Sequence, residues 1–325
     1  MTLSSVPQPA HEVHVRAPGK VNLSLRVGPL GPGEQYHQLT TVFQAVSVYE
    51  EVVARSSDER TVTVSGPQAA LVPTDATNLA LRAVEALAAA TGTDEGVALH
   101  VDKGVPVAGG MAGGSADAAA TLLACDALWR TGLSRAELLE LAATLGSDVP
   151  FVLQGHTAMG QGRGELLTPA LSRGEFHWAF AVRDTGLSTP AVYREFDRLH
   201  ALADDPREAL RRGGGVAVPP DPDDDVRLMQ ALRAGDPHAL GAALHNDLQA
   251  AALELEPGLA EPLAVAQDAG ALGVVVSGSG PTVAALARNR QHALVLAAAF
   301  TASGVADRVL TATGPVPGAR IVAED

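Results

Sequence analysis

The sequence is poor in cysteine, aromatic residues and lysine, and each shortage narrows the class of protein it can encode. Its single cysteine, Cys125, excludes an internal disulfide and suits a reducing cytoplasm. Aromatic residues make up only 3% of the chain. Of its 23 basic residues only Lys20 and Lys103 are lysines, which leaves 21 arginines. A lysine kept among arginines indicates a place that needs a compact ammonium, although codon bias gives the same count.

Long apolar runs and an excess of positive charge are also missing. No apolar stretch reaches membrane-spanning length, and residues 1–14 lack the basic start and apolar run of a signal peptide. A formal net charge of −14 argues against nucleic acid and anionic membranes as partners. It leaves room for a local site that binds a small anion. With 325 residues, 46% of them hydrophobic, we expect a cytoplasmic globular protein of one large or two medium domains.

Hydrophobic patterning predicts a mixture of strands and helices in the first half of the chain. Alternation over residues 21–27 predicts a strand with one buried face. The further predicted elements are strands at 43–53, 61–64 and 97–102 and helices at 80–92, 118–129 and 134–146. Cys125 falls on the apolar face of the second of these helices, where a core position is the simplest interpretation.

The pattern restarts after about residue 170, which suggests a second domain. The expected elements are strands at 176–182, 274–276 and 282–286, helices from Thr189 and at 242–255, and a mobile loop at 204–225. Strands and helices mix without strict β-α-β alternation, so the predicted fold class is α+β in two domains, residues 1–170 and 171–325.

The strongest local signal is a run of small residues between the strand at 97–102 and the helix at 118–129. The run consists of Pro106, Val107, Ala108, Gly109, Gly110, Met111, Ala112, Gly113, Gly114, Ser115 and Ala116. Small residues let a backbone approach a ligand closely, and the free N–H groups of a helix N-terminus bind anions. The run is therefore a phosphate-cradling loop or a tightly packed helix entry, and its flanking strand and helix favour the loop. It matches neither G-x-x-x-x-G-K-[ST] nor G-x-G-x-x-G.

With two more segments, this run resembles the three motifs of the GHMP small-molecule kinases. The segments are Pro18-Gly19-Lys20-Val21-Asn22-Leu23 and Ser277-Gly278-Ser279-Gly280. Tyr36-His37-x-Leu39 and Gly146-Ser147-Asp148-Val149-Pro150-Phe151 resemble the branch that phosphorylates a cytidine diphosphate-linked methylerythritol in non-mevalonate isoprenoid biosynthesis. The likeness runs from about Val15 to Leu286. It departs at Glu34-Gln35, Ser147, Ala112 and Ala116, where Asp-Gly, Ala, Gly and Ser are usual.

The resemblance implies a fold and a reaction. The N-terminal domain would resemble the second domain of ribosomal protein S5, the C-terminal domain would be ferredoxin-like, and the site would lie between them. The implied reaction is ATP-dependent phosphorylation of the 2-hydroxyl of the cytidylated substrate, with ATP and Mg²⁺ as cofactors. Two alternatives stay open: another GHMP kinase acting on homoserine, mevalonate or a sugar, and a non-catalytic metabolite sensor of the same fold.

The resemblance also implies catalytic roles for Lys20 and Asp148. Asp148 would accept the proton of the substrate hydroxyl, and Lys20 would keep Asp148 ionised and neutralise charge on the reacting oxygens. The alternative for Asp148 is a helix cap. Asn22 lies two residues from Lys20 on the same side of the strand, so both side chains reach one cavity.

Three side chains would hold the cytidine end of the substrate by the same resemblance. Tyr36 and Tyr193 would stack on the ring and His37 would read the base edge, although the two tyrosines also suit partly buried packing positions.

The remaining implied roles concern ATP and the metal. Asn78 and Lys103 would lie near the purine or ribose, with a surface role as the alternative for each. Ser115 or Asp117 would hold a Mg²⁺-bound water, unless Asp117 is only a partner of the helix dipole. The turn of Ser277, Gly278, Ser279 and Gly280 would close the site from the C-terminal domain.

Overall fold

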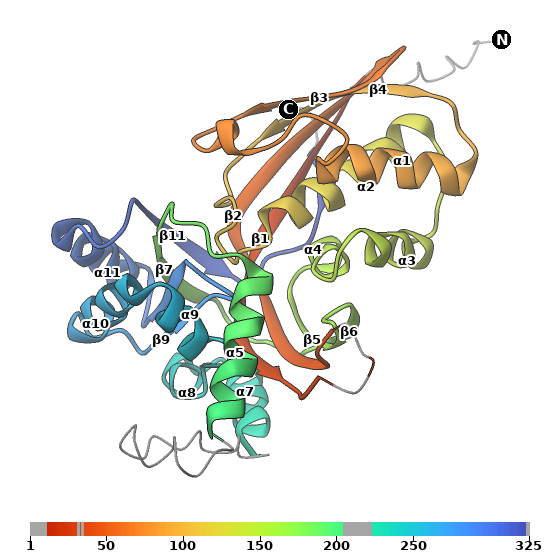
Figure 1. The fold of residues 1–325 in the computed structure, drawn as a ribbon. Helices are drawn as coiled ribbons and strands as arrows, with labels where there is room; N and C mark the ends of the chain where they lie inside the picture. Colours follow the sequence, from red (N-terminus) through yellow and green to blue (C-terminus); the bar gives the residue numbers. More distant parts are fainter. Residues whose placement is uncertain (1–11, 31–32, 34–35, 204–222, 323–325) are drawn as a thin grey trace.

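Two β-sheets organise the chain in the computed structural model, which describes residues 12–30, 33, 36–203 and 223–322 (Figure 1). The larger sheet runs in the order β12-β1-β2-β4-β3, with β5, β6 and β8 paired beside this path. Its strands are β1 (Glu12–Val27), β2 (Leu39–Ser57), β3 (Arg60–Ser65), β4 (Gly96–Asp102), β5 (Thr157–Gly162), β6 (Leu166–Pro169), β8 (His245–Asn246) and β12 (Arg320–Ile321). The smaller sheet has the order β11-β7-β10-β9 and is formed by β7 (Phe176–Val182), β9 (Gly273–Val276), β10 (Val283–Ala287) and β11 (Arg308–Gly314).

Four helices pack on one face of the larger sheet. They are α1 (Leu79–Thr91), α2 (Gly113–Trp129), α3 (Arg135–Leu145) and α4 (Val149–Gln154), with a short 3₁₀ helix at Ala69–Leu71. The Asn78 side chain caps α1 by accepting from the Ala80 N–H, and Ser134 with Glu137 forms the expected capping box of α3. Cys125 is buried in the core between these helices and the sheet, as expected.

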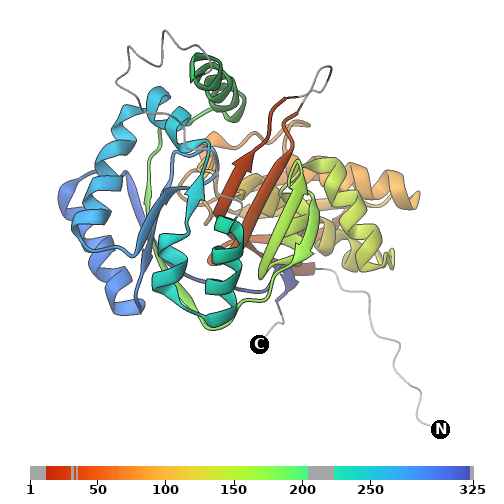
Figure 2. The ribbon, with the colours of Figure 1, turned by 90° about the horizontal axis from the view of Figure 1, so that it is seen from below.

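The smaller sheet is antiparallel throughout and separates two cores. Alternate residues of β7 point to opposite faces, so Trp178 and Phe180 pack against the larger sheet while Ala179 and Ala181 face the outer helices. The helices of this half are α5 (Thr189–Ala203), α7 (Asp223–Ala234), α8 (Pro237–Ala242), α9 (Gln249–Leu255), α10 (Ala260–Asp268) and α11 (Arg290–Ser303), with a 3₁₀ helix at Pro257–Leu259. The view from below shows the larger sheet between its own helices and the smaller sheet (Figure 2).

The strand order of the smaller sheet matches the ferredoxin-like expectation. Numbered along the chain, its four strands lie in the order 4-1-3-2, with helices between the first two strands and between the last two. Two short strands of this half, β8 and β12, return to pair with β1 of the larger sheet. The division into residues 1–170 and 171–325 stays a prediction, and these returning strands join the two parts.

Two predicted elements differ from the structure. The strand predicted at 21–27 is the end of β1, and residues 17–25 are buried on both faces rather than one, because the polar side chains line an internal site. The helix predicted at 242–255 is wrong in its first half. There the chain pairs with β1 as β8, and helix α9 begins only at Gln249. Most of the loop predicted at 204–225 lies outside the described residues, and α7 begins at Asp223.

Candidate active site

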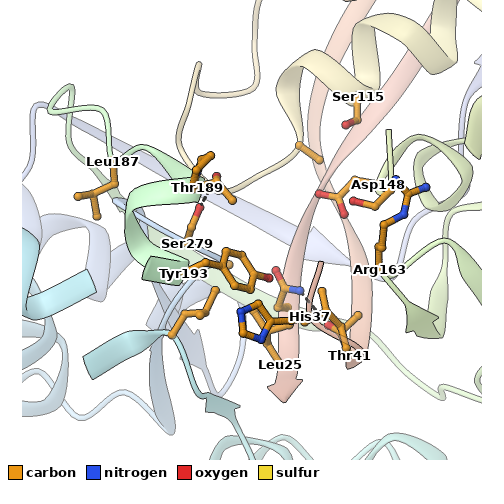
Figure 3. A pocket seen from close by; sticks show the side chains of 18 of the residues that line it. Leu25, His37, Thr41, Ser115, Asp148, Arg163, Leu187, Thr189, Tyr193 and Ser279 are labelled. Carbon is orange, nitrogen blue, oxygen red and sulfur yellow. Dashed lines mark hydrogen bonds between the residues drawn. The ribbon is translucent and has the colours of Figure 1, made fainter. Parts of the chain in front are cut away.

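A cavity of about 750 Å³ lies where β1, the N-terminus of α2, α4, α5 and the turn after β9 meet (Figure 3). Of the residues predicted to bind or react, the structure brings a subset to its walls: Lys20, Asn22, Tyr36, His37, Ala108, Gly109, Gly110, Ala112, Gly113, Gly114, Ser115, Asp148, Tyr193, Gly278 and Ser279. In the part of the chain that the structure describes, no helix is long and apolar enough to cross a membrane. Over the same residues, no three His, Cys, Asp or Glu side chains are grouped to hold a metal ion.

Lys20 lies at the inner end of the cavity with its ammonium held by neighbouring oxygens. Its Nζ donates to Asn22 Oδ1 at 2.7 Å and to the Gly110 carbonyl at 2.8 Å, and lies 3.8 Å from Asp148 Oδ2. Burial lowers the pKa of Lys20, and the nearby charge of Asp148 opposes that effect in part. Two of the three ammonium donors are therefore engaged by neutral oxygens, and the third is available to Asp148 or to a ligand oxygen.

A short chain of hydrogen bonds fixes the Asn22 amide toward Lys20. Asn22 Nδ2 donates to Thr41 Oγ1 at 2.8 Å, and Thr41 Oγ1 donates to the Ser24 carbonyl at 2.7 Å. Because Thr41 uses its proton on Ser24, it can only accept from Asn22. The carbonyl oxygen of the amide is thereby turned toward the ammonium.

Asp148 occupies the N-cap position of α4, but its side chain does not cap that helix. It makes no side-chain hydrogen bond to the first turn, and it lines the cavity with 27% of the side chain exposed. The helix-cap alternative is therefore not supported by the geometry. The carboxylate points into the cavity, as Figure 3 shows.

The glycine-rich run folds as a tight loop that leads into α2. Gly110 has a positive φ of 72°, and a side chain there would overlap the carbonyl oxygen of Ser277. Ser277 Oγ donates to the Gly110 carbonyl at 3.1 Å, so this loop and the closing turn pack backbone against backbone. Four predicted ATP-binding residues of this run do not line the cavity: Pro106, Val107, Met111 and Ala116.

His37 and Tyr193 form a stack at the other end of the cavity. Their ring centroids lie 5.4 Å apart at an interplanar angle of 28°. His37 Nδ1 donates to the Gly28 carbonyl at 2.8 Å, and its Nε2 lies 3.3 Å from Asp197 Oδ1. Burial, followed by the charge of Asp148, raises the pKa of the Tyr193 hydroxyl, which keeps the phenol neutral. Tyr36 does not join the stack: it is 59% exposed and lies under the guanidinium of Arg163.

The closing turn is anchored to both sheets by Asn246. Its amide nitrogen donates to the carbonyls of Val276 and Gly278, each at 2.7 Å, while its backbone pairs with Leu25 of β1. Ser279 Oγ lies 2.9 Å from Thr189 Oγ1, which links the turn to the start of α5. Ser277 and Gly280 support the turn without lining the cavity.

Three further predicted ligand-binding residues, outside the loop and the closing turn, do not line the cavity. Asn78 is 3% exposed, and its side chain accepts from the Ala80 N–H and donates to the Pro73 carbonyl. Lys103 and Asp117 are 3% and 4% exposed and are bonded to one another, with Lys103 Nζ 2.7 Å from Asp117 Oδ2. The surface alternative for Asn78 and Lys103 is therefore wrong, and neither Lys103 nor Asp117 lines the cavity in this structure.

Six polar residues that line the cavity received no site role from the sequence: Thr41, Ser147, Arg163, Thr189, Arg194 and Asp197. Arg163 stands between Gly162 and Gly164, a setting that commonly exposes a side chain at a turn. Asp197 follows Tyr193 by four residues on α5, so helical spacing places the two side chains on one face. Those two signals were available in the sequence.

The fold and both sequence matches define this chain as a GHMP kinase. The family models for the GHMP kinases N terminal domain and the GHMP kinases C terminal match residues 78–156 and 228–306. The homoserine kinase from Cytophaga hutchinsonii has a related structure, with a TM-score of 0.73 at 18% identity over 98% of this chain and 100% of the other. At that identity the likeness concerns the fold alone, a two-domain α+β GHMP kinase fold.

Within that class the chain belongs to the family of 4-diphosphocytidyl-2-C-methyl-D-erythritol kinases. The relative of that name from Leifsonia xyli subsp. xyli is 52% identical over 314 residues, which are 96% of this chain and 99% of the relative. The one from Nocardia farcinica is 52% identical over 98% of both chains. A crystal structure of a 4-(cytidine 5'-diphospho)-2C-methyl-D-erythritol kinase has a TM-score of 0.71 at 31% identity, covering 92% of this chain and 98% of its own.

Proposed function

We propose that this chain transfers the γ-phosphoryl group of ATP to the 2-hydroxyl of 4-diphosphocytidyl-2-C-methyl-D-erythritol, in non-mevalonate isoprenoid precursor biosynthesis. The observation that carries this proposal is one cavity with two chemically different ends. A lysine and a carboxylate lie at one end, Lys20 and Asp148, and an aromatic stack lies at the other, His37 and Tyr193. An ATP-dependent enzyme acts where ATP is available, so the cytoplasm stays the expected location.

Asp148 and Lys20 would carry the reacting end. Asp148 accepts the proton of the substrate hydroxyl, whose oxygen bonds to the γ-phosphorus while the bond from that phosphorus to the ADP oxygen breaks. Lys20, held by Asn22 and Gly110, offers its remaining donor to the oxygens on which negative charge develops. Most of the rate gain in such a transfer comes from positioning and charge, which matches a site whose groups are fixed before substrate binds.

The loop and the start of α2 would hold the phosphates of ATP. The free N–H groups of the first turn of a helix favour anions, and Gly113, Gly114 and Ser115 line the cavity there. Ser115, whose hydroxyl lines this part of the cavity, would offer an oxygen to Mg²⁺ or to one of its waters, because Mg²⁺ keeps waters and takes phosphate oxygens as ligands. When bound, Mg²⁺ would neutralise phosphate charge. Asp117 does not suit that role, since its carboxylate is bonded to Lys103.

The stacked end would hold the cytidine of the substrate. An aromatic face suits any base, and His37 Nε2, which lies 3.3 Å from Asp197 Oδ1 in this structure, is the ring nitrogen that would read the base edge. Arg163 and Arg194 line the cavity and would offset the charge of the substrate diphosphate. Tyr36, which contacts Arg163, would act at the entrance rather than within the stack.

An ADP-release assay on the purified chain tests the proposal. We expect ATP-dependent turnover with 4-diphosphocytidyl-2-C-methyl-D-erythritol and none above background with mevalonate or homoserine. Turnover of either of those two at a higher kcat/KM would replace the proposal with another GHMP kinase. ATP binding without turnover of any acceptor would favour the sensor, and measured ATP binding separates that result from an unfolded preparation.

A further inference from the structure

Three ionisable side chains are buried together behind the glycine-rich loop. Lys103 Nζ lies 2.6 Å from Glu50 Oε1 and 2.7 Å from Asp117 Oδ2, and the exposed fractions of Glu50, Lys103 and Asp117 are 0%, 3% and 4%. Glu50 lies on β2, Lys103 directly follows β4, and Asp117 is in the first turns of α2. The triad therefore connects β2, the end of β4 and α2 at one point.

The triad contacts both ends of the segment that carries the loop. Glu50 Oε2 accepts from the backbone N–H of Gly104, where the segment leaves β4. A side chain at Gly113, where α2 begins, would lie 3.2 Å from Glu50 Oε1. Residues 104–117 are thus held at their entry by Gly104 and at their exit by Asp117, and the cavity-lining part of the loop lies between these anchors.

The energetics of buried charge indicate positioning rather than stability. Removing charges from water costs several kcal/mol per ion, roughly, and an ion pair regains this only with good geometry. Asp117 Oδ1 has no hydrogen-bond partner although it is buried, so the triad is not an optimised stabilising network. Such a group is better explained by the register that it imposes on the chain.

We propose that Glu50, Lys103 and Asp117 are positioning residues that set the glycine-rich loop for ATP, and that Lys103 acts through the two carboxylates without touching the nucleotide. The inference rests on ATP binding at this loop but not on the identity of the phosphoryl acceptor. The contacts of Lys103 with Glu50 and Asp117 fix where α2 starts relative to β2 and β4. In this way they keep the loop in the conformation that the phosphates need.

Replacing the lysine alone and replacing all three charges tests the proposal. Lys103→Met leaves two buried carboxylates without their cation, so we expect the Kd for ATP, measured calorimetrically without acceptor, to rise about tenfold or more. Lys103→Met combined with Glu50→Gln and Asp117→Asn leaves no unpaired buried charge. Because the triple variant also lacks the contacts that set the loop, we expect it to bind ATP about as weakly as Lys103→Met, with a higher melting temperature than Lys103→Met. If the triple variant bound ATP like the wild type, the triad would not set the loop, and the proposal would be overturned.

A second variant covers the case in which Lys103→Met fails to fold. Glu50→Gln with Asp117→Asn keeps Lys103 and the hydrogen-bonding shape but removes the two charges. We expect a Kd for ATP raised about tenfold, with the KM for the phosphoryl acceptor changed less than about threefold. An unchanged Kd for ATP would overturn the proposal, since a free Lys103 would then be sufficient.

Leu296→Ala is the matched control for stability. Leu296 is fully buried in the core beneath α11, away from the cavity walls, so its loss lowers the melting temperature without altering the loop. We expect it to bind ATP like the wild type. If it weakened ATP binding as much as the triad variants do, the triad would be a stabilising cluster and not a positioning one. Because ATP binding is measured without acceptor, a wrong acceptor in the proposed function leaves this test intact.

Discussion

The two lysines of the chain lie in opposite surroundings. Lys20 faces the cavity, bonded to two neutral oxygens and 3.8 Å from one carboxylate. Lys103 lies behind the loop, between two carboxylates at 2.6 and 2.7 Å. Burial acts to lower the pKa of both lysines. At Lys20 it prevails, and the charge of Asp148 only reduces the fall in pKa. At Lys103 the charges and hydrogen bonds of Asp117 and Glu50 outweigh burial and raise the pKa.

The difference supports the two proposed roles, a reactive one for Lys20 and a positioning one for Lys103. An ammonium whose donors are committed to carboxylates is fixed in charge and place, and it has little left to give a ligand. An ammonium at the wall of a cavity, with one weakly engaged donor, can stabilise negative charge that develops during a reaction. Scarcity of lysine drew attention to both positions without excluding codon bias, and the tertiary contacts show that their surroundings differ.

Replacing the carboxylate beside Lys20 is expected to have the largest effect. Asp148→Asn removes the proton acceptor but keeps the size of the side chain, so kcat should fall about 10²- to 10⁴-fold with ATP binding nearly unchanged. Asp197→Asn is the control, because Asp197 also lines the cavity but contacts His37 rather than Lys20. Steady-state kinetics of both variants check this. Near wild-type turnover by Asp148→Asn would remove it from the role of base.

Exchanging each lysine for arginine is expected to affect different properties, kcat at Lys20 and thermal stability at Lys103. Lys20→Arg should lower kcat about 10²- to 10³-fold, because a planar guanidinium cannot occupy the space of an ammonium packed between Gly110 and Gly278. Lys103→Arg should act first on the melting temperature, because the larger group must fit between two buried carboxylates. Kinetics and thermal unfolding of both variants measure the contrast. Equal losses of kcat at the two positions would show that the surroundings do not determine the roles.

A smaller effect is expected at the stacked end of the cavity. Tyr193→Ala removes a stacking partner that contributes about 1–3 kcal/mol to binding of a base, so the KM for the cytidylated substrate should rise about tenfold. Tyr193→Phe keeps the ring and should stay near the wild type, since the phenol remains neutral. Both KM values come from the ADP-release assay. A large loss in Tyr193→Phe would mean that the hydroxyl, and not the ring, carries the contact.

Much of the site follows from local sequence. Alternation in β1 places Lys20 and Asn22 on one side of the strand, and a run of small residues before a helix indicates a close backbone approach. Both features depend on neighbours within a few positions, where spacing alone determines direction.

The rest depends on contacts between distant segments. Glu50, Lys103 and Asp117 meet only because β2, β4 and α2 pack together, and nothing near Glu50 in the sequence marks it as the partner of a lysine. The helix predicted over 242–255 fails for the same reason, since pairing of His245–Asn246 with β1 outweighs the local helical pattern. Glu34 and Gln35, where the sequence departs from the family pattern, lie outside the described residues.

The smallest expected effect is a pH dependence of stability. It tests the surroundings of Lys103 through its neighbour Glu50. Burial first, and the charge of Asp117 second, raise the pKa of Glu50 to about 8 from a usual 4.5. Between these values the folded chain binds more protons than the unfolded chain, so the free energy of unfolding falls as pH rises through this window. Each kcal/mol of unfolding free energy that is lost lowers the melting temperature by about 2–4 °C. We expect this drop to occur between about pH 5.5 and 8.5. Glu50→Gln cannot titrate and should flatten that slope, whereas an unchanged slope in Glu50→Gln would assign the pH dependence to other groups.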